Sequence, residues 1–131
     1  MTEKKIMALA DRFFIVAILF ALTGMSLGIW MGITGPEVFN YAAVHAHINL
    51  AGWATLFLYG LWYRGAPAAS STGLAQAHFW IAVVGAILLV IGIVGAVMPN
   101  ETLDKVVIPG SLLTLLAMVI FLVMVARHRS A

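Results

Sequence analysis

Residues 74–98, LAQAHFWIAVVGAILLVIGIVGAVM, form a stretch of 25 positions without a charged side chain. A helix rises about 1.5 Å per residue, so about 20 apolar residues cross the hydrocarbon core of a bilayer. Three more apolar stretches of similar length occur in the chain, at residues 13–33, 38–63 and 106–126. The sequence therefore predicts an integral membrane protein with four spans.

The composition of the whole chain agrees with this class. Of 131 residues, 63% are hydrophobic and 9% are charged, and the mean hydropathy of +1.07 lies far above that of soluble proteins. Four spans and their connections fill the chain, so we expect one transmembrane domain over residues 1–131. Cysteine is absent, which excludes disulfides, iron–sulfur clusters and thiolate-held copper or zinc. Histidine, methionine and carboxylate side chains must supply any metal ligands.

Helix-ending residues separate the four stretches. Gly35 and Pro36 follow the first, Gly65 and Pro67 follow the second, and Pro99 follows the third. The lengths fit helices better than the alternating strands of a membrane barrel, which predicts an all-α four-helix bundle. The first stretch is as long as a span and lacks a small-residue cleavage site, so we expect it to be a retained helix.

The distribution of charge predicts the orientation in the membrane. Basic residues gather at one set of helix ends, at Lys4, Lys5, Arg12, Arg64, Arg127 and Arg129. The opposite ends carry Lys105 with Glu37, Glu101 and Asp104. By the positive-inside rule we expect both termini in the cytoplasm, and in a bacterial inner membrane the acidic ends would face the periplasm. This rule accounts for the net charge of +2, so we expect no nucleic-acid partner.

Small residues recur at helical spacing in two of the stretches. The first stretch carries a double G-x-x-x-G pattern at Gly24, Gly28 and Gly32. One face of the third carries Ala82, Gly85, Gly92 and Ala96, with His78 on the same stripe. Such stripes let helix backbones approach closely, which favours helix-packing seams. They would also admit a flat macrocycle between helices.

Residues 44–50, VHAHINL, place two imidazoles and an amide inside an apolar segment. A full charge at the centre of a membrane helix costs roughly 2.5 to 3.5 kcal/mol, so ionisable groups there need a partner. His45 shares a face with Asn49, whereas His47 is rotated by about 200° from it, onto a smooth face with Ala43. We expect the two histidines to serve different partners.

Height along the membrane normal separates His47 from His78. Counted at 1.5 Å per residue, His47 lies roughly 13 Å from the outer end of its helix and His78 about 6 Å from the inner end of the next. The two axial ligands of one haem lie at similar height, so a difference of about 15 Å argues against His47 and His78 of one chain binding the same haem. In a parallel two-fold dimer, each His47, or each His45, would meet its symmetry mate at equal depth. His78 would also find headgroups and water at the inner interface.

Residues 13–63 resemble the first two helices of the large catalytic subunit of the haem-copper oxidase superfamily. The likeness rests on residues 22–28, LTGMSLG, and on VHAHINL. In the nitric oxide reductase and C-type oxidase branches, the second helix opens with a His-x-Asn-like pattern, which matches His47 and Asn49. Mitochondrial-type oxidases show an Ala-His-Ala-like pattern, which matches His45 instead. In either register, the resemblance implies an axial ligand of low-spin haem b.

That large subunit carries its other haem ligand and its copper histidines on later helices, which this chain lacks. The resemblance therefore implies a haem b cytochrome for one-electron transfer rather than a complete oxidase or reductase. The second axial position would be taken by His78, by the other histidine of the pair or by a second subunit, or left open as in a gas sensor. Residues 77–80, AHFW, also resemble the third-helix start of small four-span proteins similar to this subunit.

The candidate cofactor site comprises His45, His47 and His78 as iron ligands, with Asn49 and Trp53 nearby. The mid-helix indole of Trp53 would meet a haem edge or a backbone carbonyl. We expect a homodimer or higher oligomer in the lipid bilayer, with a quinol or a periplasmic redox protein as partner. Two other classes stay open, namely a copper or zinc site that draws histidines from several helices or subunits, and a cofactor-free assembly subunit of a respiratory complex.

Overall fold

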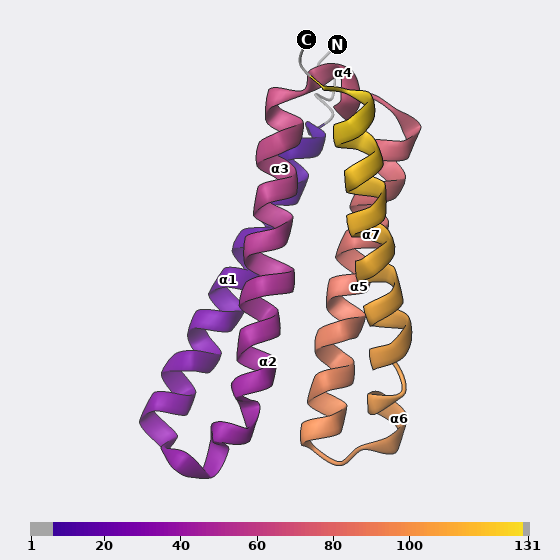
Figure 1. Cartoon of the computed structure of the whole chain (residues 1–131). Coiled ribbons are helices and arrows are strands. Elements are labelled where there is room, and N and C mark those ends of the chain that lie inside the picture. Colours follow the sequence, from indigo (N-terminus) through magenta and orange to yellow (C-terminus); the bar gives the residue numbers. More distant parts are fainter. Residues whose placement is uncertain (1–6, 130–131) are drawn as a thin grey trace, which may run out of the picture.

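Two long helical hairpins lie side by side (Figure 1). The computed structural model describes residues 7–129, and within this part of the chain every regular element is a helix. The first hairpin pairs α1 (Leu9–Thr34) with a composite rod that ends in α3 (Thr55–Gly65), and the second pairs α5 (Gly73–Val97) with α7 (Val107–Arg127). The all-α prediction is confirmed.

Three helical segments are long and apolar enough to cross a membrane. They are Leu9–Thr34, Gly73–Val97 and Glu101–Arg127. Their surfaces expose large apolar side chains such as Leu22 and Leu122. Exposing apolar patches of this extent to water is unfavourable, whereas contact of such patches with lipid tails is not. The fold is therefore that of a membrane protein with several crossings.

The second predicted span, residues 38–63, is a composite rod rather than one regular helix. It consists of η1 (Pro36–Tyr41), α2 (Ala42–His47), η2 (Ile48–Ala54) and α3. η1 is a tight 3-10 turn, whereas η2 is a wider π-helical turn, and α2, η2 and α3 follow one another without a break. The rod therefore enters through a 3-10 turn and holds a π turn directly after His47.

The π turn makes one side-chain hydrogen bond within the rod and packs closely against α1. The Thr55 hydroxyl donates to the Leu50 carbonyl, five residues earlier, over 2.7 Å. At Gly52, an added Cβ would overlap the ring of Phe20 from α1, so this glycine admits the aromatic ring against the backbone of the rod. π turns of this kind are rare and frequently occur at functional sites.

The predicted glycine seams hold each hairpin together. In the first hairpin, Gly24 and Gly28 receive the side chains of Asn49 and His45, whereas Gly32 has no such neighbour within 4 Å. In the second hairpin, the backbones of α5 and α7 approach closely at Gly85, Gly92 and Gly110, and Gly95 meets the backbone of α6. Ala82 is buried on the same seam, but Ala96 is exposed. The packing prediction is thus confirmed except at Gly32 and Ala96.

The ends of the helices differ from the predicted boundaries by a few residues. α1 begins four residues earlier than predicted, and in this added turn Asp11 pairs with Arg64 and Arg12 donates to Gln76. The connections that follow the rod and α5 contain the short helices α4 (Pro67–Ser70) and α6 (Glu101–Asp104). Pro109 lies in the first turn of α7, where its missing amide hydrogen is harmless.

The start of α1 and the end of α7 lie at the same end of the molecule, beside α4 (Figure 1). This arginine end carries Arg12, Arg64, Arg127 and Arg129. The opposite, acidic end carries Glu37, Glu101 and Asp104 with Lys105. The predicted separation of charge is therefore present in the fold, and Lys4 and Lys5 lie outside the described residues.

We expect Gly92→Ala to lower the free energy of unfolding by about 1 to 3 kcal/mol, because its methyl group would overlap the backbone of Val107. Gly32→Ala is the matched control, since its methyl group meets nothing within 4 Å and alanine favours the helix by about 1 kcal/mol. Thermal unfolding of both variants in detergent, followed by circular dichroism, provides the measurement. Equal midpoints for the two variants would contradict the close α5–α7 contact.

Candidate functional site

His47 ends α2 with an exposed side chain. Its Nδ1 lies 2.7 Å from the Ala43 carbonyl, one turn earlier. A carbonyl only accepts hydrogen bonds, so Nδ1 carries the proton and Nε2 keeps its lone pair. Among residues 7–129, Nε2 has no hydrogen-bond partner. The imidazole is thus held by its own helix, with its basic nitrogen free.

His45 lies on another face of the rod and packs against α1. Its Nδ1 donates to the Gly24 carbonyl over 2.9 Å, and its ring rests on Gly28. Asn49 lies beside this ring and donates to the His45 carbonyl over 2.9 Å. His45 and Asn49 therefore act together as a polar contact between two helices. His45 and His47 thus lie on different faces of the rod, as predicted.

His78 is completely buried in a box of aromatic rings in the half of the bundle near the arginine end. The rings come from all the long elements, namely Phe13 of α1, Tyr59 and Tyr63 of α3, and Phe121 of α7. The Tyr63 hydroxyl lies 2.8 Å from His78 Nδ1. Nε2 makes no hydrogen bond with any described residue.

The expectation that headgroups and water satisfy His78 was wrong, because this face of α5 packs against the other long helices. Only one of its nitrogens has a regular partner, and that partner is a phenol. In a regular helix, the i+18 spacing would place Tyr63 on the same stripe as His45, and this polar stripe is the sequence signal that Tyr63 faces the protein interior.

The structure does not bring the three candidate histidines together. His78 contacts Tyr63, which lies 18 residues, or about 27 Å, along the rod from His45. Both axial nitrogens of a haem bind the same iron, so His78 and the His45–His47 pair cannot share one group within a single chain. Over residues 7–129, no three His, Cys, Asp or Glu side chains are grouped so as to hold a metal ion.

Trp53 lies within η2 and is half-buried beside Phe57, with ring centroids 4.9 Å apart. Its indole makes no hydrogen bond to any residue between 7 and 129, so the expected backbone-carbonyl partner is not found. Arg12 joins the two hairpins, a contact that the sequence pattern did not indicate. Its Nη1 donates to Gln76 Oε1 over 2.6 Å, and the guanidinium lies 4.2 Å from the centre of the Phe79 ring.

Comparisons of the chain with family models, curated proteins and solved structures find no match. Function is therefore inferred from the residues and their geometry.

We expect Tyr63→Phe to destabilise the protein by about 0.6 to 2 kcal/mol, because it removes the hydrogen bond to a buried imidazole. Tyr41→Phe is the control, since Tyr41 packs edge-on against Trp30 and its hydroxyl bonds to no described residue. Thermal unfolding of the two variants in the same detergent measures the difference. Unchanged stability in Tyr63→Phe would show that this contact contributes nothing to the packing of the two hairpins.

Proposed function

We propose that this chain is a membrane cytochrome b subunit that binds haem b through His47 at an interface with a second copy of itself. The observation that supports this is the exposed imidazole of His47, with Nδ1 tied to the Ala43 carbonyl and Nε2 free. Bound haem would supply reversible one-electron transfer. The protein would supply the axial nitrogen, its orientation and an apolar surface around it.

The chemistry of His47 suits an axial ligand. An iron ligand must be an unprotonated imidazole nitrogen, and ligating histidines usually donate their other N–H to a carbonyl or carboxylate. The Ala43 carbonyl provides that acceptor and holds the ring in one orientation. His45 is the weaker choice, because its ring is packed on Gly28 and lies against the Asn49 amide.

A second copy would supply the other axial ligand. His47 projects from the surface of the first hairpin, and no other described histidine reaches it. A two-fold axis parallel to the membrane normal would place two His47 side chains at equal depth. The neighbouring Ala43 and Ala46 are small and exposed, which leaves room for a flat ring between the subunits.

The proposal includes four spans and an orientation. The rod formed by α2, η2 and α3 would be the fourth span, since residues 42–65 cover about 36 Å. The positive-inside rule would place the arginine end in the cytoplasm. His47 would then lie in the outer half of the bilayer of a bacterial inner membrane, within reach of a quinol or a periplasmic redox protein.

We expect the protein purified from haem-supplied cells to show Soret and alpha bands that sharpen on reduction. His47→Ala should lose these bands, because the iron loses its ligand, whereas His45→Ala and His78→Ala should keep them. Absorption spectra of the four purified proteins provide the measurement. Absence of pigment, or full haem retention in His47→Ala, would refute the proposal. Copper or zinc bound without these bands would favour the metal-site alternative, and the absence of both would favour an assembly subunit.

Stoichiometry tests the intersubunit site separately. We expect one haem per two chains and a low-spin spectrum, because two imidazoles complete the coordination of the iron. Haem extraction with protein quantification, electron paramagnetic resonance of the oxidised protein and the mass of the detergent-solubilised complex provide the measurements. One high-spin haem per monomer would contradict the shared site and would point to an open coordination position suited to gas binding.

A further inference from the structure

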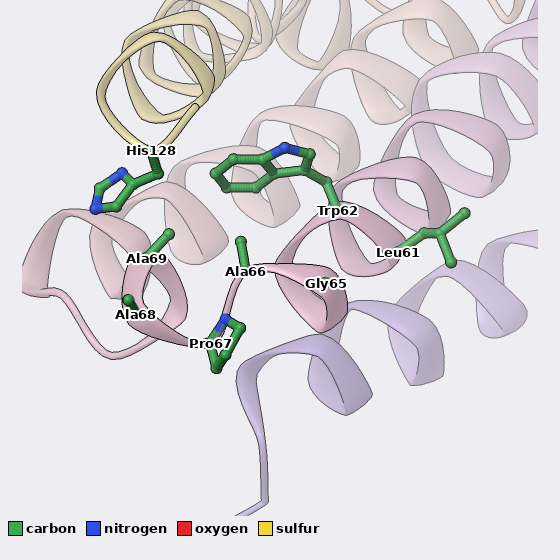
Figure 2. A pocket seen from close by; sticks show the side chains of 8 residues that line it. All are labelled: Leu61, Trp62, Gly65, Ala66, Pro67, Ala68, Ala69 and His128. Carbon is green, nitrogen blue, oxygen red and sulfur yellow. The ribbon is translucent and has the colours of Figure 1, made fainter. Parts of the chain in front are cut away.

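A pocket of about 380 Å³ opens at the arginine end of the bundle, between the α3–α4 turn and the end of α7. Figure 2 shows His128 on one side of it and the indole of Trp62 on the other, with Ala66 between them. Pro67 and Ala69 complete much of the lining. This pocket lies far from His47, since Trp62 is 15 residues, or about 22 Å, further along the rod.

The two larger groups in the lining give the pocket a mixed character. His128 Nδ1 donates to the Met124 carbonyl over 3.1 Å, so Nε2 is free for another partner. Trp62 is held by the rings of Tyr63 and Phe121, at centroid distances of 5.1 and 5.4 Å, and its indole forms a fixed wall. The remaining lining is mostly small and apolar. A ligand with one polar and one apolar part fits this lining.

The charge around the pocket is positive. Arg127 and Arg129 are exposed and lie on either side of His128 in the sequence. Arg64 directly precedes Gly65, which lines the pocket. Asp11 is the one acidic residue described at this end, and Arg64 already pairs with it. Among the described residues, Arg127 has no ion-pair partner. None of these arginines lines the pocket, but each lies next to a lining residue, so positive charge beside the pocket favours an anion.

We propose that this pocket binds the phosphate headgroup of an anionic membrane lipid. The pocket lies where α3 and α7 end, at the height expected for a headgroup layer, and tryptophan favours that layer. Basic residues at the membrane surface attract anionic lipids. The phosphate would lie near Arg127 and His128 Nε2, with the glycerol part against Trp62. A free phosphate ion would interact with the positive charges but would not need the apolar contact with the Trp62 indole.

Thermal stability in detergent tests this proposal with three probes, namely a short-chain phosphatidylglycerol, the phosphatidylcholine of the same chain length, and inorganic phosphate. Because a ligand that binds only the folded state stabilises it, phosphatidylglycerol should raise the unfolding midpoint by several degrees. The other two probes should shift it little. Equal shifts with both lipids would overturn the proposal, and so would a full shift with inorganic phosphate, which would indicate a simple anion site.

Variants locate the site within the molecule. The double variant Arg127→Gln with His128→Ala should lose most of the response to phosphatidylglycerol, and Ala68→Leu should reduce it by filling the exposed edge of the pocket. Lys105→Gln, at the acidic end, is the charge-matched control and should respond like the parent protein. The readout is the shift between lipid-free and lipid-bound samples of one variant, so a change in basal stability does not affect it. A full response in the double variant would refute the proposed site.

Discussion

An apolar surrounding offers no hydrogen bonds, so every polar side chain in the long helices of this protein must find its partner within the protein. His45 and Asn49 find theirs on α1 and on their own rod, and His78 finds Tyr63 across the two hairpins. These contacts determine which faces of the helices meet. His47 differs from these residues, because its side chain is exposed and its Nε2 has no hydrogen-bond partner among the described residues. Because of that difference, the proposed haem site is placed at His47.

Close contact between backbones complements these polar contacts. In the second hairpin, glycines on both helices allow α5 and α7 to touch without intervening side chains. In the first hairpin, Gly24 and Gly28 instead make room for the polar side chains of the opposing rod. The same residue type thus serves two purposes, because what packs against a glycine depends on the facing helix. The seam of the first hairpin is filled by an imidazole and an amide, which leaves no place there for a macrocycle.

The two proposed sites lie toward opposite ends of the bundle and depend on different kinds of interaction with their ligands. The His47 surface is apolar, and its function would come from one lone pair directed away from the chain. The pocket at the arginine end combines a fixed indole, an imidazole and unpaired positive charge, which suits an amphipathic anion. Between them lies the aromatic box around His78, which joins the two hairpins. In the proposed orientation, the bundle would be anchored through lipid on one side and would carry its cofactor toward the other.

The sequence by itself determined the apolar helical class, the approximate positions of the long helices, the separation of basic from acidic ends, and the different faces of His45 and His47. These properties follow from composition and from the 100° step of a helix, which are local. Only the tertiary structure decided that His78 is buried against Tyr63, that Phe20 packs on Gly52 within a π turn, that Arg12 bonds to Gln76, and that Trp62 and His128 share a pocket. Each of these contacts joins residues of different helices, and their pairing depends on how the helices meet within and between the two hairpins, which no periodicity within one helix encodes.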